Sequence, residues 1–243
     1  MMMRYPKPLR ILHPKIDLHP NKRYLSDADV KKLLRGKVYI EEKLDGSHLG
    51  FEIKGGKPVT FTTNQHLWES DKRHEFNGVL QWLWENYDKI VKIPKGHRMC
   101  GEWLKVQHHI HYNDLPDWFI AYDVIDVRKR EFLSYKEKTK VISKCGFHQA
   151  VLLGEGMYYK DDLYDIAMNQ SNYGEENMEG VVVKRDKFET LGKLVMQEFL
   201  DGIVDEHHHW SSPRQKLNKL SDKVIRSKED EPDNTGKASG VLV

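Results

Sequence analysis

The chain has 243 residues, of which 39% are hydrophobic and 31% are charged, and its formal net charge is +2 with histidine counted as neutral. This composition suits one folded globular domain with small appendages, and no apolar run approaches the ~20 residues that a membrane-spanning helix needs. The first residues, MMMRYPKPLRILHPK, lack the apolar core of a signal peptide, and the two cysteines show no metal-binding spacing, so we expect a reduced, cytoplasmic protein without a membrane partner.

The first part of the chain predicts a capped helix followed by an antiparallel sheet. The helix is SDADVKKLL (26–34), in a region rich in proline and basic residues. Hydrophobic and polar residues then alternate along KVYIEEK (37–43), SHLGFEIK (47–54) and PVTFTTN (58–64). Because these short strands follow one another through tight turns, such as Gly55-Gly56, we expect antiparallel pairing.

The rest of the chain predicts helices that alternate with strands. Residues 70–90 carry apolar side chains at helical spacing, which predicts an amphipathic helix with Trp82 and Trp84 in the core rather than on a stacking surface. Further strands are predicted over 98–104, 117–126, 149–155 and 178–185, and further helices over 134–145 and 161–170. MEGVVVKR (178–185) is the most β-branched run in the chain, which favours a strand.

These segments predict one α+β domain, mostly antiparallel, over residues 37–200. We expect residues 1–36 to be an N-terminal extension packed on this core, and residues 201–225 to be a short C-terminal helical segment. The tail, 226–243, is polar and almost free of apolar residues, which predicts disorder.

Lys43 ends a predicted strand among acidic residues, Glu41, Glu42 and Asp45, and just before Gly46. A lysine nucleophile must lose its proton, although its reference pKa is near ~10.4, and neighbouring carboxylates raise that pKa further. A reactive Lys43 therefore needs cations brought in from distant sequence. Without them, Lys43 is an exposed strand lysine paired with Glu41.

Residue types that a nucleoside triphosphate site needs occur downstream. Lys184 and Lys193 offer cations for phosphates, and Glu102 and Glu179 lie at predicted strands and offer carboxylates for Mg²⁺ or for ribose hydroxyls. Tyr122 offers a flat ring for the base, although an aromatic residue in a strand can equally pack in the core.

The order of these elements resembles the motif series of the covalent nucleotidyltransferases, which are the ATP-dependent DNA and RNA ligases and the mRNA capping enzymes. The matching stretches are Lys43-Leu44-Asp45-Gly46, Gly101-Glu102-Trp103, Phe119 to Asp123, Glu179 to Lys184, and Lys193. One KxDG pattern alone is weak, but five elements in this order are strong. The resemblance implies an ATP-grasp-like nucleotidyltransferase domain of antiparallel sheets flanked by helices.

Within this superfamily the chain looks most like an RNA ligase. The nucleophile motif continues as Gly46-Ser47-His48, whereas DNA ligases and capping enzymes usually carry an arginine at the position of His48. The stretch WLKVQHHIHYNDLPDWFIAYDV resembles the corresponding segment of viral and bacterial RNA ligases. Too few residues follow Lys193 for the oligonucleotide-binding (OB) barrel of DNA ligases and capping enzymes, so we expect no C-terminal OB barrel.

The resemblance implies an enzyme that uses ATP as AMP donor and Mg²⁺ (or Mn²⁺), with RNA as its partner. Lys43 would attack the α-phosphorus and expel pyrophosphate, AMP would pass from lysyl–AMP to an RNA 5′-phosphate, and an RNA 3′-hydroxyl would release AMP on sealing. The implied catalytic residues are Lys43, Glu179, Lys184 and Lys193, with Glu179 as metal ligand. The implied nucleotide-binding residues are Glu41, Glu42, Lys43, Asp45, Glu102, Tyr122, Lys184 and Lys193.

Individual roles follow from the same resemblance. Glu102 would hold ribose hydroxyls, Tyr122 would stack on adenine, and Asp45 would support the loop or the ribose. Lys184 and Lys193 would neutralise the α-phosphate and lower the pKa of Lys43. Strand parity places Glu41 on the side of Lys43, so that Glu41 would face the base and Glu42 would point away.

Two features depart from the family pattern. The family often has an arginine after the nucleophile motif, but the matching stretch FTTNQH (61–66) has none, and Arg23, Arg35 or Lys37 would have to replace it. Glu179 and Lys184 also differ in strand parity, so both face one site only if a bulge intervenes or Glu179 precedes the strand.

Three alternatives stay open. The chain could be a minimal DNA ligase or an enzyme that adenylates DNA ends. It could be a non-catalytic nucleotide- or RNA-binding protein, although binding alone does not need a nucleophile. It could also be an unrelated α+β protein whose motifs match by coincidence. The histidine clusters, His108, His109 and His111 and then His207 to His209, raise the possibility of zinc, but no cysteine or spaced partner accompanies them.

Overall fold

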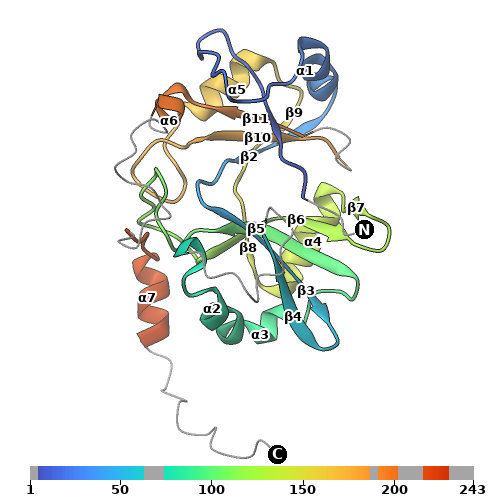
Figure 1. Cartoon of the computed structure of the whole chain (residues 1–243), viewed down its shortest axis with the longest axis vertical. Coiled ribbons are helices and arrows are strands. Elements are labelled where there is room, and N and C mark those ends of the chain that lie inside the picture. Colours follow the sequence, from blue (N-terminus) through green and yellow to red (C-terminus); the bar gives the residue numbers. More distant parts are fainter. Residues whose placement is uncertain (1–4, 63–73, 187–190, 202–215, 230–243) are drawn as a thin grey trace, which may run out of the picture.

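In the computed structural model, the described residues are 5–62, 74–186, 191–201 and 216–229. They form two β-sheets that lie one above the other in Figure 1, with helices on the outer side of each sheet. This arrangement confirms the predicted α+β class. Neither sheet closes into a barrel among these residues, as expected.

The first sheet, sheet A, has five strands in the order β1-β11-β10-β2-β9. All neighbours are antiparallel except β1 and β11, which are parallel. The strands are β1 (Leu9–Arg10), β2 (Val38–Glu42), β9 (Leu152–Gly156), β10 (Gly180–Lys184) and β11 (Leu191–Val195). Sheet A thus joins the two ends of the predicted domain, since β2 lies beside β10.

The second sheet, sheet B, has six strands, with β4-β3-β5-β6-β7 in order and β8 paired with β6. Only the β6–β8 pair is parallel. The strands are β3 (Ser47–Lys54), β4 (Lys57–Phe61), β5 (His97–Trp103), β6 (Phe119–Asp126), β7 (Glu131–Phe132) and β8 (His148–Gln149). The turn after Lys43 carries the chain from sheet A to sheet B.

Helices cover the outer faces of both sheets (Figure 1). On sheet A, α1 and α5 pack against β10 and β11 through an apolar cluster that includes Leu33, Leu163 and Val181. On sheet B, α2, α3 and α4 pack through a cluster that includes Trp82, Ile90 and Ile142. The helices are α1 (Asp27–Leu34), η2 (His74–Phe76), α2 (Val79–Glu85), α3 (Tyr87–Ile90), α4 (Tyr135–Cys145), α5 (Lys160–Ala167), α6 (Gln197–Asp201) and α7 (Asp222–Glu229).

Period-two alternation decides which side chains of sheet A face sheet B. Ile40 in β2 and Val183 in β10 are fully buried under the helices. Their neighbours Glu41 and Lys184 therefore point to the opposite face, toward sheet B. Charged side chains therefore gather on the inner face, whereas the apolar side chains of the outer face pack under the helices.

The structure corrects three details of the predicted elements. The helix expected over 70–90 is broken: residues 70–73 lie outside the described part, Gly78 takes a positive φ of 85°, and α2 ends at Glu85 with Asn86 as its C-cap. The strand expected over 149–155 is two strands, β8 and β9, in different sheets. The C-terminal helix α7 reaches Glu229, four residues into the segment that was expected to be disordered (226–243).

One tryptophan also differs from expectation. Trp82 is buried as predicted, but Trp84 is 75% exposed. The part of the chain that the structure describes contains no helix that is long and apolar enough to cross a membrane.

Candidate active site

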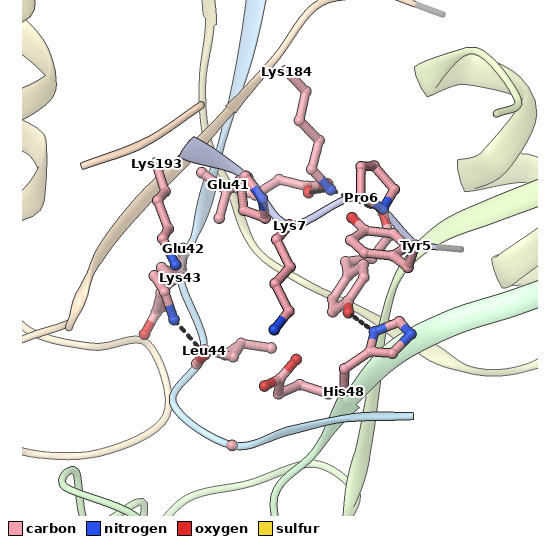
Figure 2. Close-up of a pocket in the computed structure, with 15 residues that line it drawn as sticks. Tyr5, Pro6, Lys7, Glu41, Glu42, Lys43, Leu44, His48, Lys184 and Lys193 are labelled. Carbon is pink, nitrogen blue, oxygen red and sulfur yellow. Dashed lines mark hydrogen bonds and ion pairs between the residues drawn. The ribbon is translucent and has the colours of Figure 1, made fainter. Parts of the chain in front are cut away.

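A cavity of about 370 Å³ opens between the two sheets, and most of the expected site residues line it. Lys43, Lys184, Lys193, Glu41, Glu42, Glu102 and Tyr122 all contribute to its wall. Its size lies within the range of small-molecule sites. Figure 2 shows Lys43 and Lys193 at one end and His48 with Tyr5 at the other, so the cavity has a cationic end and an aromatic end.

The turn that holds Lys43 requires a glycine behind it. A Cβ on Gly46 would lie 2.5 Å from the carbonyl oxygen of Trp103, too close for any other residue. The backbone N–H of Lys43 also donates to the carbonyl of Gly180, which ties the nucleophile motif to the start of β10. These contacts explain why the Lys-x-Asp-Gly pattern positions the amine between the sheets.

Lys43 lies in an acidic environment. Its Nζ donates to Oε2 of Glu179 at 2.5 Å and to the carbonyl oxygen of Leu44 at 3.3 Å. Burial by itself would lower the pKa of Lys43, but the charges of Glu179 and Glu102 outweigh it, and the pKa is raised. The expectation that lysines lower this pKa is therefore wrong for the ligand-free protein.

Glu179 and Glu102 reach the site from different sheets. Glu179 directly precedes β10, which resolves the parity conflict without a bulge in β10. A Cβ on Gly180 would lie 2.0 Å from the carbonyl oxygen of Leu194, so the close approach of β10 and β11 needs this glycine. Burial raises the pKa of both carboxyls, and it takes that of Glu102 to about 8.

Lys193 is the second amine at the cationic end. Its pKa falls to about 8, because burial disfavours the charged form and Lys43 repels it. Lys193 therefore holds its proton weakly in the absence of an anion. Figure 2 shows it beside Lys43 on the same wall of the cavity.

Lys184 belongs to a buried ion network instead of standing free for a phosphate. Its Nζ lies 2.5 Å from Oε2 of Glu41 and 3.0 Å from Oδ2 of Asp123. Lys138 from α4 contacts the same two carboxylates, at 2.6 Å and 3.2 Å, and is completely buried. Because these charges compensate one another, the predicted action of Lys184 on the pKa of Lys43 has no support in the ligand-free structure.

Glu41 and Glu42 point in different directions, as strand parity predicts. Glu41 lies in the buried network, whereas both carboxylate oxygens of Glu42 accept hydrogen bonds from Ser171 or Asn172, at 2.5–3.0 Å. Glu42 still belongs to the cavity wall. Since its carboxylate is fully engaged elsewhere, the structure favours a supporting role over nucleotide contact.

Asp45 also supports the loop and does not line the cavity. It accepts hydrogen bonds from the backbone N–H groups of His109 and Ile110, at 2.7 and 2.9 Å. Burial would raise its pKa, but the side chain of His109, the nearby charge of His108 and the backbone N–H of Ile110 lower it to about 2. Two residues of the first histidine cluster thus surround a structural aspartate, while His207 to His209 lie outside the described residues.

Tyr122 lies at the aromatic end of the cavity, in contact with His48 and with Tyr5, of which the sequence did not single out Tyr5. Its hydroxyl is hydrogen-bonded to Nδ1 of His48. Tyr5 packs against it, with ring centroids 5.3 Å apart, and donates its hydroxyl to Asp123 at 2.5 Å. Residues 5–8 therefore form an N-terminal strap across this end of the cavity, and Figure 2 shows the amine of its Lys7 pointing inward.

The carboxylates near Lys43 fit a hard divalent cation. Buried carboxyls with raised pKa, such as Glu102 and Glu179, gain from a positive charge placed between them. No group of three or more metal-binding side chains occurs among the described residues. Two carboxylates without further protein ligands are a donor set typical of Mg²⁺, which completes its coordination shell with water and substrate phosphates.

Lys138, Tyr5 and Lys7 are the site residues that sequence reasoning missed. Lys138 had a usable signal, because Ile142 and Cys145 follow it at helical spacing and all three are buried on one face of α4. Tyr5 and Lys7 lie in a short segment without periodicity, which offers no comparable signal.

Comparisons with known proteins show the family and the fold of the chain. The family model described as RNA ligase matches residues 36–195. A Naegleria gruberi RNA ligase structure with PPi has a TM-score of 0.61 at 17% identity, over 74% of this chain and 55% of that chain. A mutant of the same ligase with ATP and Mn has a TM-score of 0.60 at 16% identity, over 72% of this chain and 54% of that chain.

A further mutant of the Naegleria gruberi ligase, with AMP and Mn, gives a TM-score of 0.58 at 16% identity, over 72% of this chain and 54% of that chain. These structural matches show a shared fold, and they extend over about half the length of the matched ligase. Comparison with curated protein sequences gives no match.

Proposed function

The chain belongs to the RNA ligase family, and from this membership we propose that it joins RNA ends with ATP through a lysyl–AMP on Lys43. The substrates are a 5′-phosphate and a 3′-hydroxyl, and the second intermediate is a 5′-adenylated RNA. The observation that carries the proposal is the position of the Lys43 amine, in a cavity whose wall also includes Lys193 and Glu102.

In the first step, the Lys43 nitrogen forms a bond to the α-phosphorus, and the bond from that phosphorus to the bridging oxygen breaks. The amine gives its proton to solvent once the nucleotide and its cation draw Glu179 away from it, and pyrophosphate leaves. Lys193 supplies positive charge to the phosphate oxygens, where charge builds up in the transition state.

The remaining nucleotide contacts follow from the walls of the cavity. Glu102 accepts from the ribose hydroxyls, and Tyr122 at the aromatic end contacts the base. Glu41 and Lys184 close the wall behind the base as a neutral pair. A bound Mg²⁺ or Mn²⁺ supplies charge neutralisation on the phosphates, and Glu179 is the residue that would hold it.

In the second step, an oxygen of the RNA 5′-phosphate attacks the same phosphorus, and the Lys43 nitrogen leaves. In the third, the RNA 3′-hydroxyl attacks the 5′-phosphate of the adenylated end, a phosphodiester forms, and AMP leaves. All three steps are displacements at phosphorus, so positioning and charge neutralisation account for most of the catalysis.

Intact-mass spectrometry after incubation with ATP and Mg²⁺ tests the covalent step. We expect a mass gain of one AMP in the unchanged protein and none in Lys43→Ala. Lys37→Ala is the matched control, because Lys37 is an exposed lysine that pairs with Glu155 away from the cavity. An unlabelled wild-type protein that still binds ATP would indicate a non-catalytic nucleotide-binding protein.

Sealing assays test the substrate class. We compare matched RNA, DNA and hybrid substrates with 5′-phosphate and 3′-hydroxyl ends, and we expect RNA ends to be sealed faster than the others. Product from DNA ends alone would favour a minimal DNA ligase, and adenylated ends without sealing would favour an end-adenylating enzyme.

A further inference from the structure

A row of paired residues crosses sheet A on the face that looks toward sheet B. Glu41 pairs with Val182, Val182 with Lys193, and Lys193 with Arg10. The first three line the cavity, from the base side to the cationic end. Arg10 lies one strand beyond Lys193 and belongs to none of the family motifs.

The side chain of Arg10 shares the inner face of the sheet with Lys193. The next residue, Ile11, packs under the helices and is 2% exposed, so alternation turns Arg10 to the other face. A Cβ on Gly192 would meet Leu33 and Ile11, which places Lys193 on that same opposite face. Two backbone hydrogen bonds fix its strand, because the Arg10 N–H donates to the carbonyl of Arg23 and the Leu25 N–H donates to the carbonyl of Arg10.

The guanidinium of Arg10 is buried without an obvious structural purpose. Arg10 is only 9% exposed, and its Nη1 has no hydrogen-bond partner among the described residues. Glu179 is the carboxylate that acts on it electrostatically, but Glu179 is already bound to Lys43. A buried, unpaired charged donor is costly unless a ligand satisfies it.

Arg10 and Lys193 are moreover like charges on directly paired positions. Such pairs destabilise a sheet, and the low pKa of Lys193 reflects this crowding in part. An anion between the two side chains removes the repulsion and supplies acceptors for Nη1. Phosphate suits an arginine fork especially well.

We propose that Arg10, together with Lys193, binds the phosphate group joined to the α-phosphorus, which is the β-phosphate of ATP and later the 5′-phosphate of the RNA. This inference rests on the proposed function and adds to it the residue that replaces the missing arginine of FTTNQH. The order of residues along the row supports this assignment, since Arg10 lies one strand farther from the base than Lys193 does.

In-line displacement explains how one subsite serves both substrates. Pyrophosphate leaves from the side of the phosphorus opposite the Lys43 nitrogen. In the next step that nitrogen is the leaving group, so the RNA phosphate oxygen must enter from the side that pyrophosphate vacated. A cation fixed on that side contacts each phosphate in turn.

Nucleotide affinities separate this role from a structural one. Binding of AMP and of α,β-methylene-ATP, whose carbon bridge prevents release of pyrophosphate, is measured by calorimetry with Mg²⁺ present. Arg10→Gln should weaken the analogue about 10- to 100-fold and change AMP affinity less than about 3-fold. Arg128→Gln is the matched control, because Arg128 is an exposed arginine outside the cavity and its substitution should leave both affinities unchanged.

The second arm follows transfer of AMP from purified lysyl–AMP enzyme to 5′-phosphorylated RNA in a single turnover. Arg10→Gln should slow this transfer as well. If Arg10→Gln weakens only the affinity for the ATP analogue, the subsite binds pyrophosphate alone. If it slows only the transfer of AMP to RNA, the subsite binds the RNA phosphate alone. Both results keep the anion subsite and narrow its ligand.

Equal weakening of AMP and analogue, or no effect in either arm, overturns the inference. Should Arg10→Gln fail to fold, Arg10→Lys decides by the same comparison, with a smaller but still selective loss expected because the charge remains and the fork is lost. If the unchanged protein binds neither nucleotide, the proposed function itself fails, and the assignment of Arg10 with it.

Discussion

The Nζ of Lys43 lies 2.5 Å from Oε2 of Glu179, although 136 residues separate them in the chain. Antiparallel pairing of β2 with β10 brings them together. Because the carboxylates raise the pKa of Lys43, we expect this amine to keep its proton and to be a poor nucleophile until a nucleotide binds. We infer that activation requires a ligand that draws Glu179 away from the amine, which the bound nucleotide and its cation would do.

Glu179→Gln tests this arrangement in two opposite directions. We expect formation of lysyl–AMP to fall about 100-fold or more, because a charged group at the reacting centre is lost. Without nucleotide, by contrast, the pKa of Lys43 should fall, and labelling of Lys43 by a neutral acylating reagent at pH 8 should become faster. Peptide mass spectrometry measures both. Glu198→Gln, an exposed carboxylate on α6, should change neither, and slower labelling of Lys43 in Glu179→Gln would contradict the account.

The stability of the ligand-free protein should pass through a minimum near pH 8. The pKa of Glu102 is raised to about 8 from 4.5, so folded protein binds the extra proton and its stability decreases as pH rises through 8. The pKa of Lys193 is lowered to about 8 from 10.5, so the unfolded chain binds more protons above pH 8 and stability increases toward pH 10.5.

Thermal melts across pH 5–10 check this minimum. The acidic and alkaline sides of the stability profile should depend on different residues. Glu102→Gln should flatten the acidic side, and Lys193→Met should flatten the alkaline side and raise stability at neutral pH. A profile that the two substitutions leave unchanged would show that other groups set the pH dependence.

Much of the fold could be predicted from periodicity, because alternation and helical spacing report which face of an element is buried. The predicted strands over 47–54, 98–104 and 117–126 differ from β3, β5 and β6 by two residues or fewer at each end. Periodicity does not report which sheet a strand joins. The segment around Ala150 therefore read as one strand, although it passes from sheet B to sheet A.

The sequence predicted which residues line the site better than it predicted their charge environment. Parity placed Glu41 and Glu42 on opposite faces, as their partners Lys138 and Ser171 show. It could not show that Lys184 is neutralised by a network, because the second lysine of that network, Lys138, comes from a distant helix. The acidic neighbours of Lys43 in the sequence indicated a raised pKa, which the structure bears out, whereas the lowering by Lys184 and Lys193 that the family resemblance implied is wrong. Electrostatics depends on three-dimensional neighbours, which a motif does not report.

Tyr5 should contribute directly to nucleotide affinity. It lines the aromatic end of the cavity with Tyr122 and is held there by its hydrogen bond to Asp123. Tyr5→Ala should weaken AMP about 10-fold, in line with the loss of one aromatic contact to a base. Calorimetry measures the change, and Tyr24→Ala, in the same N-terminal segment but outside the cavity, is the control. Tighter binding in Tyr5→Ala would instead identify the strap as an obstruction.

Lys138→Met should destabilise the protein and weaken nucleotide binding together. The substitution leaves Glu41 and Asp123 with one cation, Lys184, where two now share them, and both carboxylates are buried. Loss of one partner from such a network typically costs about 3–5 kcal/mol, which urea denaturation measures. Lys184 should then move closer to the two carboxylates, and Glu41 should move away from the cavity wall together with Lys184. The affinity for AMP should decrease as a result.

A double substitution separates lost charge balance from lost packing. In Lys138→Met with Asp123→Asn, one cation and one anion are removed together, so a large part of the stability should return, since the remaining pair is Lys184 with Glu41. Lys140→Met, at an exposed position of the same helix, should change stability by less than about 0.5 kcal/mol. If the double variant is no more stable than Lys138→Met, then Lys138 acts through its packed side chain rather than through its charge.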